Sequence, residues 1–266
     1  MIKILGILNI TEDSFSDGGK FLDPAAAIAQ AEKLMADGAD AVDAGAASSH
    51  PDAKPVPPEV EIARLAAVIP ALKARGIAVS VDSFSSEVQR WALTQSVEYL
   101  NDIHGFPDAA LYPELAKAEC KLIVMHMVQE RGVAVRTDVL PSEIFARVTA
   151  FFDARITALT GAGIAREHLI LDPGMGQFVG NDPQNSLILL RRLPELKMRY
   201  GLPLLVSVSR KGFLRQLTGQ SLEKIGPASL AAELFTAGQG TDIIRTHDPA
   251  ALRDGLKLLE SLKEAR

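Results

Sequence analysis

The sequence predicts an α/β barrel in which eight parallel strands alternate with helices and form a single domain over residues 1–266. Three observations lead to this prediction. Eight short apolar runs recur along the chain, they are nearly continuous in Val, Ile and Leu rather than alternating, and longer amphipathic segments separate them. A (β/α)8 or TIM barrel usually has about 250 residues, and this chain has 266.

The predicted strands are the apolar runs themselves. They lie at 2–8, 40–45, 77–82, 98–102, 121–126, 168–172, 203–209 and 242–247. Continuous apolar runs are typical of strands covered by helices on both faces, and such strands pair in parallel. The alternative is an open doubly wound sheet, but no glycine-rich dinucleotide fingerprint follows the first run.

Helical patterns fill the intervals between these strands. The first places Pro24 in the first turn after Asp23, a candidate N-cap, and stops at Gly38. The others lie at 57–76, 85–95, 108–118, 142–162, 183–199, 227–239 and 249–264, with a short extra helix at 210–218. The chain therefore alternates strand and helix throughout and ends in a helix.

The composition excludes several classes of protein. The chain is 47% hydrophobic and 23% charged, which is typical of a globular protein. Its net charge of −5 and scattered basic residues argue against binding to nucleic acid or to an anionic membrane. The lone Cys120 cannot form an internal disulfide, and neither a signal-peptide pattern nor an apolar run of about 20 residues is present. We therefore expect a cytoplasmic protein.

Polar side chains follow the end of every predicted strand, where the active site of such a barrel lies. In chain order they are Asn9, Asp13 and Asp17; Asp43; Asp82; Asn101 and Asp102; His126; Asp172; Ser209, Arg210 and Lys211; and Arg245, His247 and Asp248. Any single Asp or Ser at such a place could simply cap the next helix. Capping alone does not explain why so many strands carry one, so we expect these side chains to converge.

Residue type divides this set into two sub-sites. Asp82, Asn101 and Asp172 offer acceptor oxygens that suit the edge of a flat nitrogen heterocycle carrying N–H donors. Lys211 could reach the same ring. This part of the mouth is therefore predicted to bind a nitrogen heterocycle.

The second sub-site is rich in donors. Arg245 and His247 end the last strand, which is next to Asn9 in a closed barrel, and TIM barrels often bind phosphate after strands seven and eight. An anionic tail on the same ligand is expected there. Because no Cys or His cluster is present, any metal should be a phosphate-bound Mg²⁺ near Asn9 rather than Zn²⁺.

Eight motifs carry a resemblance to a known family. They are GILNITEDSFSDGG (6–19), GADAVDAG (38–45), VSVDSF (79–84), YLNDI (99–103), MHM (125–127), LILDPGMG (169–176), LLVSVSRKGFL (204–214) and IIRTHD (243–248). In this order, and over essentially the whole chain, they resemble dihydropteroate synthases. Those enzymes join 6-hydroxymethyl-7,8-dihydropterin pyrophosphate to 4-aminobenzoate, giving 7,8-dihydropteroate and pyrophosphate. The resemblance also implies a homodimer and small-molecule substrates.

The resemblance implies a role for each matching residue. The pterin pocket maps to Asp82, Asn101, Asp172 and Lys211. The pyrophosphate site maps to Arg245 and His247, with Asn9 reaching Mg²⁺, and Ser209 matches a contact to the aminobenzoate carboxylate. Phe15 and Asp17 lie in a loop that closes over the reacting carbon, so the catalytic candidates are Phe15, Asp17 and Lys211.

The chain departs from the family pattern at the aminobenzoate end. Ser49 keeps a hydroxyl where the family has threonine, but His50 replaces arginine before Pro51. Gln177 and Phe178 follow Gly176, and Phe178 stands where the family commonly has glycine. These aminobenzoate-side candidates resemble the sulfonamide-resistant Sul-type branch, in which a ring at Phe178 could reject the longer drug. The alternative is neutral drift in loops, which would leave an ordinary sulfonamide-sensitive enzyme.

Other assignments stay open from the sequence. A pterin-binding methyltransferase and a catalytically silent binding module are the alternative functions. His104 and His168 are expected to be structural, His126 to be a pocket wall and Trp91 to pack a helix. Gly212 stands where the family usually has serine, and nothing in the sequence explains it.

Overall fold

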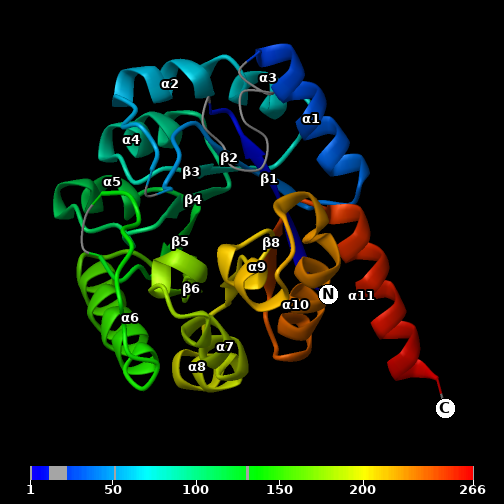
Figure 1. Cartoon of the computed structure of the whole chain (residues 1–266). Helices are drawn as coiled ribbons and strands as arrows, with labels where there is room; N and C mark the ends of the chain where they lie inside the picture. Colours follow the sequence, from blue (N-terminus) through cyan, green and yellow to red (C-terminus); the bar gives the residue numbers. More distant parts are fainter. Residues whose placement is uncertain (1, 12–22, 51, 130–131, 266) are drawn as a thin grey trace.

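Eight parallel strands form the centre of the protein (Figure 1). The structure, a computed structural model, describes residues 2–11, 23–50, 52–129 and 132–265. The strands are β1 (Lys3–Asn9), β2 (Ala41–Gly45), β3 (Val79–Asp82), β4 (Tyr99–Asp102), β5 (Lys121–Met125), β6 (Leu169–Asp172), β7 (Leu205–Val206) and β8 (Ile243–Thr246). Their order in the sheet is β6-β5-β4-β3-β2-β1-β8-β7, and every ladder is parallel.

The sheet closes on itself between its two outer strands. An isolated parallel bridge pairs Leu171 of β6 with Leu204, just before β7, and the Leu171 amide donates to the Pro203 carbonyl at 2.9 Å. This joint is much shorter than the others, since β1 and β2 alone pair over five residues. The predicted (β/α)8 barrel is therefore confirmed, and the open sheet is excluded.

Helices surround the barrel on its outside (Figure 1). They are α1 (Pro24–Ala36), α2 (Pro58–Ala66), α3 (Ile69–Ala74), α4 (Ser86–Thr94), α5 (Tyr112–Leu115), α6 (Ile144–Gly161), α7 (Pro183–Arg191), α8 (Leu193–Tyr200), α9 (Gly212–Thr218), α10 (Gly226–Gly238) and α11 (Pro249–Glu264). The Asp23 carboxylate accepts from the amides of Ala25 and Ala26, as an N-cap does. No helix in the described ranges is long and apolar enough to cross a membrane.

Two segments predicted as single helices are each broken in two. The segment 57–76 forms α2 and α3, and the segment 183–199 forms α7 and α8. In both cases a proline, Pro70 or Pro194, lies in the first turn of the second helix. Proline lacks an amide hydrogen and its ring clashes with the carbonyl four residues earlier, so the first helix has to end there.

The seventh predicted strand is also shorter than expected. The run 203–209 contributes only Leu205–Val206 to the sheet as β7. After it the backbone turns: the Lys211 amide donates to the Val208 carbonyl at 3.2 Å, and Arg210 has a left-handed φ of 58°. The residues after β7 therefore leave the ladder and turn toward the mouth of the barrel.

The interior of the barrel is apolar at one end and polar at the other. Its apolar layer consists of Leu5, Ala41, Ile123, Ile170, Leu205 and Ile243, all buried. Side chains two residues apart on a strand point to the same face. The residues two positions further along therefore form the next interior layer, and four of them are Asp43, Asp172, Ser207 and Arg245. This polar layer is the floor of the candidate site.

Candidate active site

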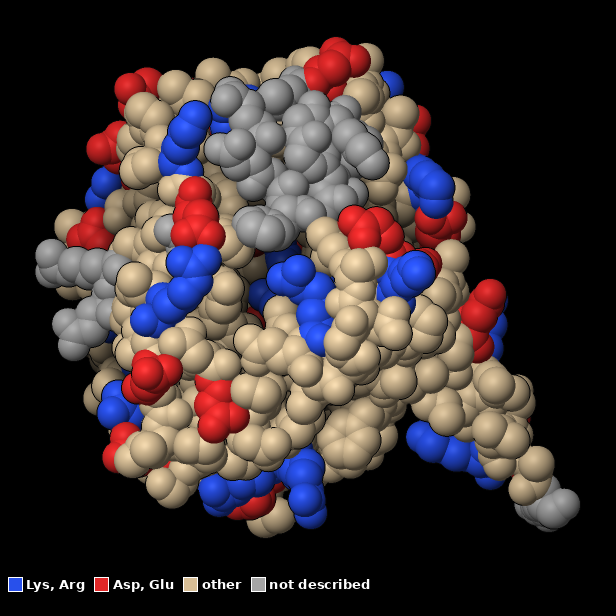
Figure 2. Space-filling model, viewed as in Figure 1, with Lys and Arg blue, Asp and Glu red and all other residues tan. Residues whose placement is uncertain are grey.

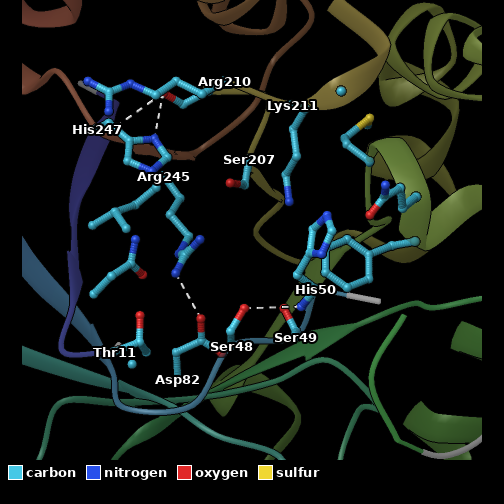
Figure 3. A pocket seen from close by; sticks show the side chains of 18 of the residues that line it. Thr11, Ser48, Ser49, His50, Asp82, Ser207, Arg210, Lys211, Arg245 and His247 are labelled. Atoms are coloured by element: carbon cyan, nitrogen blue, oxygen red, sulfur yellow. Dashed lines mark hydrogen bonds and ion pairs between the residues drawn. The ribbon is translucent and has the colours of Figure 1, made fainter. Parts of the chain in front are cut away.

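Two adjoining cavities open at the C-terminal ends of the strands. Figure 3 shows the larger one. The larger has a volume of about 200 Å³ and the smaller about 40 Å³. They share part of their lining, namely Ser49, Asp82, Met175, Phe178, Ser207, Lys211 and Arg245. The two cavities therefore form one continuous site.

The smaller cavity brings together the four residues that sequence reasoning assigned to a heterocycle. Asp82 ends β3, Asn101 lies in β4, Asp172 ends β6, and Lys211 follows β7. Lys211 and Asp82 also line the larger cavity, and in Figure 3 the Lys211 side chain points into it from the side opposite Asp82. Acceptors and a cation from four separate strands thus surround one small space.

Arg245 joins the carboxylates at the floor of the site. Its Nε donates to Asp43 Oδ2, and its Nη2 donates to Asp82 Oδ2 at 2.8 Å. The Asn101 amide also donates to Asp43 Oδ2, at 3.3 Å. Asp43 is fully buried, and its hydrogen bonds position the side chains of Asn101 and Arg245.

Asp43 lies under the candidate site, and sequence reasoning placed it at a strand end without giving it a role. Its partners Arg245 and Asn101 lie far away in sequence. The position itself was the available signal, because Asp43 follows two apolar strand residues and precedes a run of small ones. A buried carboxylate at such a place needs a charged partner.

Burial shifts the ionisation of the whole cluster. It raises the pKa of Asp82 to about 7, although Arg245 opposes the change, and it raises the pKa of Asp172 to about 6. Burial, followed by repulsion from Arg245, lowers the pKa of Lys211 to about 8. A ligand that donates N–H hydrogen bonds to Asp82 and Asp172 would favour the ionised form of both carboxylates.

Some of the buried polar atoms that lack a protein partner lie in the lining of this site. Within the described residues, the unpaired atoms of the lining include Thr11 Oγ1, Asn101 Oδ1 and Ser207 Oγ. Buried polar groups in folded proteins nearly always have a hydrogen-bond partner. The three atoms line the cavities and are available to a ligand, and sequence reasoning did not single out Thr11 or Ser207.

The donor sub-site lines the larger cavity. Asn9, Arg245 and His247 all contribute to its wall. The His247 amide donates to Ser209 Oγ at 3.2 Å, and His247 Nδ1 lies 3.0 Å from the same oxygen. Burial and the neighbouring cations, Arg210 first, hold the pKa of His247 well below its usual range, so this imidazole is neutral.

The buried carboxyl of Glu233 supports this arrangement from α10. Its side chain hydrogen-bonds to the side chains of Thr246 and Ser209, and burial raises its pKa to about 7. Ser209 is thus held between Glu233 and His247. Sequence reasoning missed Glu233 because it lies inside a helix, away from any strand end.

The aminobenzoate-side candidates that the structure describes also line the larger cavity. They are Ser49, His50, Gln177, Phe178 and Ser209. Pro51, Phe15 and Asp17 lie outside the described residues. The cavity is therefore lined by every described residue that the sequence assigned to the phosphate or to the aminobenzoate.

Phe178 is the aromatic wall between the two cavities. It belongs to a short 3-10 helix, η3 (Gly176–Val179), and only 9% of its surface is exposed. Its ring packs in a cluster with Ile103, Met125 and Met127. The Lys211 ammonium lies 4.5 Å from the ring centroid, a cation–π distance. The ring therefore contacts the lysine ammonium as well as narrowing the site.

His126 does not line either cavity, contrary to the expectation from sequence. It is buried behind the site, where Nδ1 lies 3.1 Å from the Pro173 carbonyl, and burial lowers its pKa to about 4. Its own carbonyl oxygen would be only 2.3 Å from a Cβ at Gly174, which has a φ of 73°. The histidine backbone therefore requires glycine at position 174.

The donor set restricts any metal site. Among the described residues, no group of three or more His, Cys, Asp or Glu side chains could hold a metal ion. Asn9 offers a single amide oxygen at the cavity wall. This set fits a hard ion such as Mg²⁺ only if a bound phosphate supplies further oxygens.

Comparison with known proteins decides the family. Residues 5–247 match the pterin binding enzyme family. Over 261 residues the chain is 59% identical to the dihydropteroate synthase type-2 of Escherichia coli, covering 98% of this chain and 96% of that protein. The chain belongs to the dihydropteroate synthase family. It is also 50% identical to the type-1 dihydropteroate synthase of the same organism, covering 100% of this chain and 96% of the other.

Solved dihydropteroate synthases have the same barrel. The enzyme of Xanthomonas albilineans with 4-aminobenzoic acid is 34% identical and superposes with a TM-score of 0.89, covering 100% of this chain and 94% of that one. The Yersinia pestis synthase in a sulfonamide complex is 30% identical, with a TM-score of 0.88 and coverages of 99% and 95%. The resemblance inferred from the eight motifs is confirmed. As a member of the dihydropteroate synthase family, the chain is an enzyme that transfers an alkyl group.

Proposed function

We propose that this chain condenses 6-hydroxymethyl-7,8-dihydropterin pyrophosphate with 4-aminobenzoate, releasing 7,8-dihydropteroate and pyrophosphate. One observation carries the proposal. A cavity lined by Asp82, Asn101 and Asp172 opens directly into one lined by Arg245 and His247. A heterocycle with an anionic tail needs hydrogen-bond acceptors at one end of its binding site and donors at the other.

The related synthases support the choice of substrates. The Xanthomonas albilineans enzyme has been solved with 4-aminobenzoic acid and with 7,8-dihydropteroate. These are one substrate and the product of the proposed reaction. The motifs of this chain, its site and these complexes therefore lead to the same chemistry.

Substrate binding is proposed to rest on the buried carboxylates. Asp82 and Asp172 accept hydrogen bonds from the N–H edge of the pterin, which offsets the burial that raises the pKa of both. Lys211 stays in place over the ring of Phe178 and beside the bound heterocycle. Arg245 also contacts Asp43, so the position of its guanidinium does not depend on Asp82 alone.

The bond that breaks joins the pterin methylene carbon to a pyrophosphate oxygen. Loss of pyrophosphate leaves a cation delocalised into the pterin, and the aromatic amine then attacks that carbon and loses a proton. Arg245 and neutral His247 stabilise the departing negative charge as hydrogen-bond donors. Asp17 is proposed to stabilise the cation and Phe15 to help exclude water. Because the amine is already neutral, no strong base is required.

Magnesium is proposed as the cofactor. Asn9 would hold it through one amide oxygen, together with pyrophosphate oxygens and water. When bound, Mg²⁺ neutralises charge on the leaving group. Arg245 and His247 act on the same group from the protein side.

We further propose that the enzyme discriminates against sulfonamides. Phe178 lines both cavities and is held rigidly by its buried cluster, so a substituent longer than a carboxylate would meet its ring. His50 is less bulky than the arginine of the family pattern. An ordinary sulfonamide-sensitive synthase is the alternative, and it predicts that Phe178 has no effect on inhibition.

Release of pyrophosphate tests the main proposal. Pyrophosphate should appear only when pterin pyrophosphate and 4-aminobenzoate are both present. Lys211→Met should abolish it, whereas Lys224→Met, at an exposed lysine outside the cavity lining, should not. Release without the amine would indicate a hydrolase, and no release at all would refute the synthase. A pterin-binding methyltransferase releases no pyrophosphate.

The remaining parts of the proposal concern the whole protein. The eight strands form one sheet, which supports a single domain. We propose that this domain acts as a cytoplasmic homodimer, as the family resemblance implies. Light scattering of the purified protein would give its mass in solution.

A further inference from the structure

Arg215 is a charged side chain of the site that the proposed mechanism does not use. It lies in the last turn of α9 and lines the larger cavity together with Leu222. Its Nε is buried and has no hydrogen-bond partner within the described residues. A buried guanidinium N–H is rarely left without an acceptor, so the atom indicates a group that the protein itself does not supply.

Two other cations of the cavity already have partners. Arg245 is paired with Asp43 and Asp82. Lys211 lies over the Phe178 ring at 4.5 Å and interacts electrostatically with Asp172. Both cations therefore already have a role in the proposed mechanism, Lys211 beside the pterin and Arg245 at the pyrophosphate.

The acidic residue that responds to Arg215 does not pair with it. A hydrogen bond from Ser221 lowers the pKa of Glu223, and Arg215 adds only the smallest of the named effects. Glu223 is exposed, and no ion pair joins the two side chains in the part of the chain that the structure describes. The Arg215 guanidinium therefore remains available for an anion.

Gly212 leaves space beside this guanidinium. A Cβ at position 212 would lie 3.9 Å from Arg215 Nη2, in van der Waals contact. The serine that the family usually has there would fill this side of the arginine. A contact of 3.9 Å does not exclude serine, so nothing in the structure explains the exchange of serine for glycine.

The charge of Arg215 affects the pKa of His50, which lies on the proposed aminobenzoate side of the site. Burial lowers the pKa of His50 while Asp52 opposes the change, and the charges of Arg136, Arg215 and Lys211 lower it further. In Figure 2, Lys and Arg side chains lie beside the hollow at the centre of the view, in the region where Figure 1 shows α9. Arg215 therefore acts on the same part of the site as His50.

We propose that Arg215 binds the carboxylate of 4-aminobenzoate and makes the enzyme selective for a planar, charged end group. The inference rests on the proposed synthase function. A guanidinium matches a carboxylate with two parallel hydrogen bonds, a geometry that lysine cannot reproduce. A sulfonamide has a tetrahedral sulfur and a bulky substituent in place of the carboxylate, so it gains less from Arg215. Selection by Arg215 would favour the substrate, whereas Phe178 would exclude the drug.

The test compares two amines that differ in the end group. Initial rates of pyrophosphate release are measured with 4-aminobenzoate and with neutral 4-aminobenzamide, at saturating pterin pyrophosphate. The variants are Arg215→Gln, Arg215→Lys and the matched control Lys224→Gln, which removes one exposed positive charge between α9 and α10. The quantity compared is the ratio of kcat/KM for the acid to kcat/KM for the amide.

Arg215→Gln should lower kcat/KM for the acid by about 10- to 100-fold, the effect of a lost charge-assisted bidentate contact. The value for the amide and the KM for pterin pyrophosphate should change by less than about 3-fold. Arg215→Lys should give an intermediate ratio, and Lys224→Gln the wild-type ratio.

Three results would overturn the inference. They are an unchanged ratio in Arg215→Gln, an equal fall in Lys224→Gln, and a fully retained ratio in Arg215→Lys. An inactive wild-type enzyme would instead refute the proposed function. The two failures are therefore distinguishable.

Discussion

Replacing Phe178 by glycine or alanine should make the enzyme sensitive to sulfonamides. The ring lines both cavities, and its packing against Ile103, Met125 and Met127 prevents it from turning aside. Forcing extra atoms into a well-packed site costs about 1–3 kcal/mol. Removing the ring should therefore lower the inhibition constant of a sulfonamide by about 5- to 150-fold. KM for 4-aminobenzoate should change much less.

The same substitution removes part of the core, and this cost has to be separated from the effect on the drug. Deleting a buried phenylalanine side chain costs about 3–5 kcal/mol of stability, against a total of about 5–15 kcal/mol for a typical protein. Phe84→Ala is the matched control, because Phe84 packs on the same cluster but does not line the site. It should lower the melting temperature without changing drug sensitivity.

The assay is competitive inhibition by a sulfonamide, expressed as the ratio of its inhibition constant to KM for 4-aminobenzoate. This ratio cancels any general loss of activity. If Phe178→Gly and Phe178→Ala are both folded and active but keep the parent ratio, the ring does not discriminate against the drug. A fall of the ratio in Phe84→Ala would equally contradict the reasoning.

Four further predictions follow from the ionisable groups of the protein and from the proposed metal. The kcat/KM for pterin pyrophosphate should fall below about pH 7, as Asp82 gains a proton, and above about pH 8, as Lys211 loses one. Asp43→Asn should move the acidic limb to lower pH, because Asp43 raises the pKa of Asp82; an unmoved limb would contradict this. Glu61 is buried with a pKa raised from 4.5 to about 7, so the folded state binds its proton more tightly than the unfolded state and stability falls as pH rises from about 4.5 to 7. Glu61→Gln should therefore stabilise the protein at pH 8 by up to about 3 kcal/mol in urea unfolding and have little effect at pH 4. A difference in unfolding free energy between variant and wild type that does not change with pH would show that the ionisation of Glu61 is not its cause. Chelation of Mg²⁺ by EDTA should abolish pyrophosphate release without lowering the melting temperature, since Asn9 alone offers too few ligands for a structural metal.

The strand pattern could be predicted from the sequence because each buried strand is a continuous apolar run. The breaks at Pro70 and Pro194 were missed because the apolar periodicity continues across both prolines. The prolines themselves were the available signal, because a proline inside an apolar helical pattern ends or kinks the preceding helix.

The convergence of the site was predictable, but its internal pairing was not. Residues at the ends of parallel strands have to meet in a closed barrel, which located Asp82 and Asp172 correctly. Arg245 is 202 residues away from Asp43 in sequence, and no local pattern assigns one charge to the other. Glu233 and Arg215 belong to helices, so attention to strand ends alone could not find them.

The short joint between β6 and β7 has a consequence for ligand binding. Leu171 and Leu204 close the barrel through a single bridge, and Asp172 follows directly on one side of this seam. Lys211 follows β7 on the other side. A pterin that binds both side chains would link β6 to the segment after β7, where the barrel wall has the fewest strand-to-strand hydrogen bonds. Bound substrate would then add contacts across the joint between β6 and β7 and so stabilise the closed barrel.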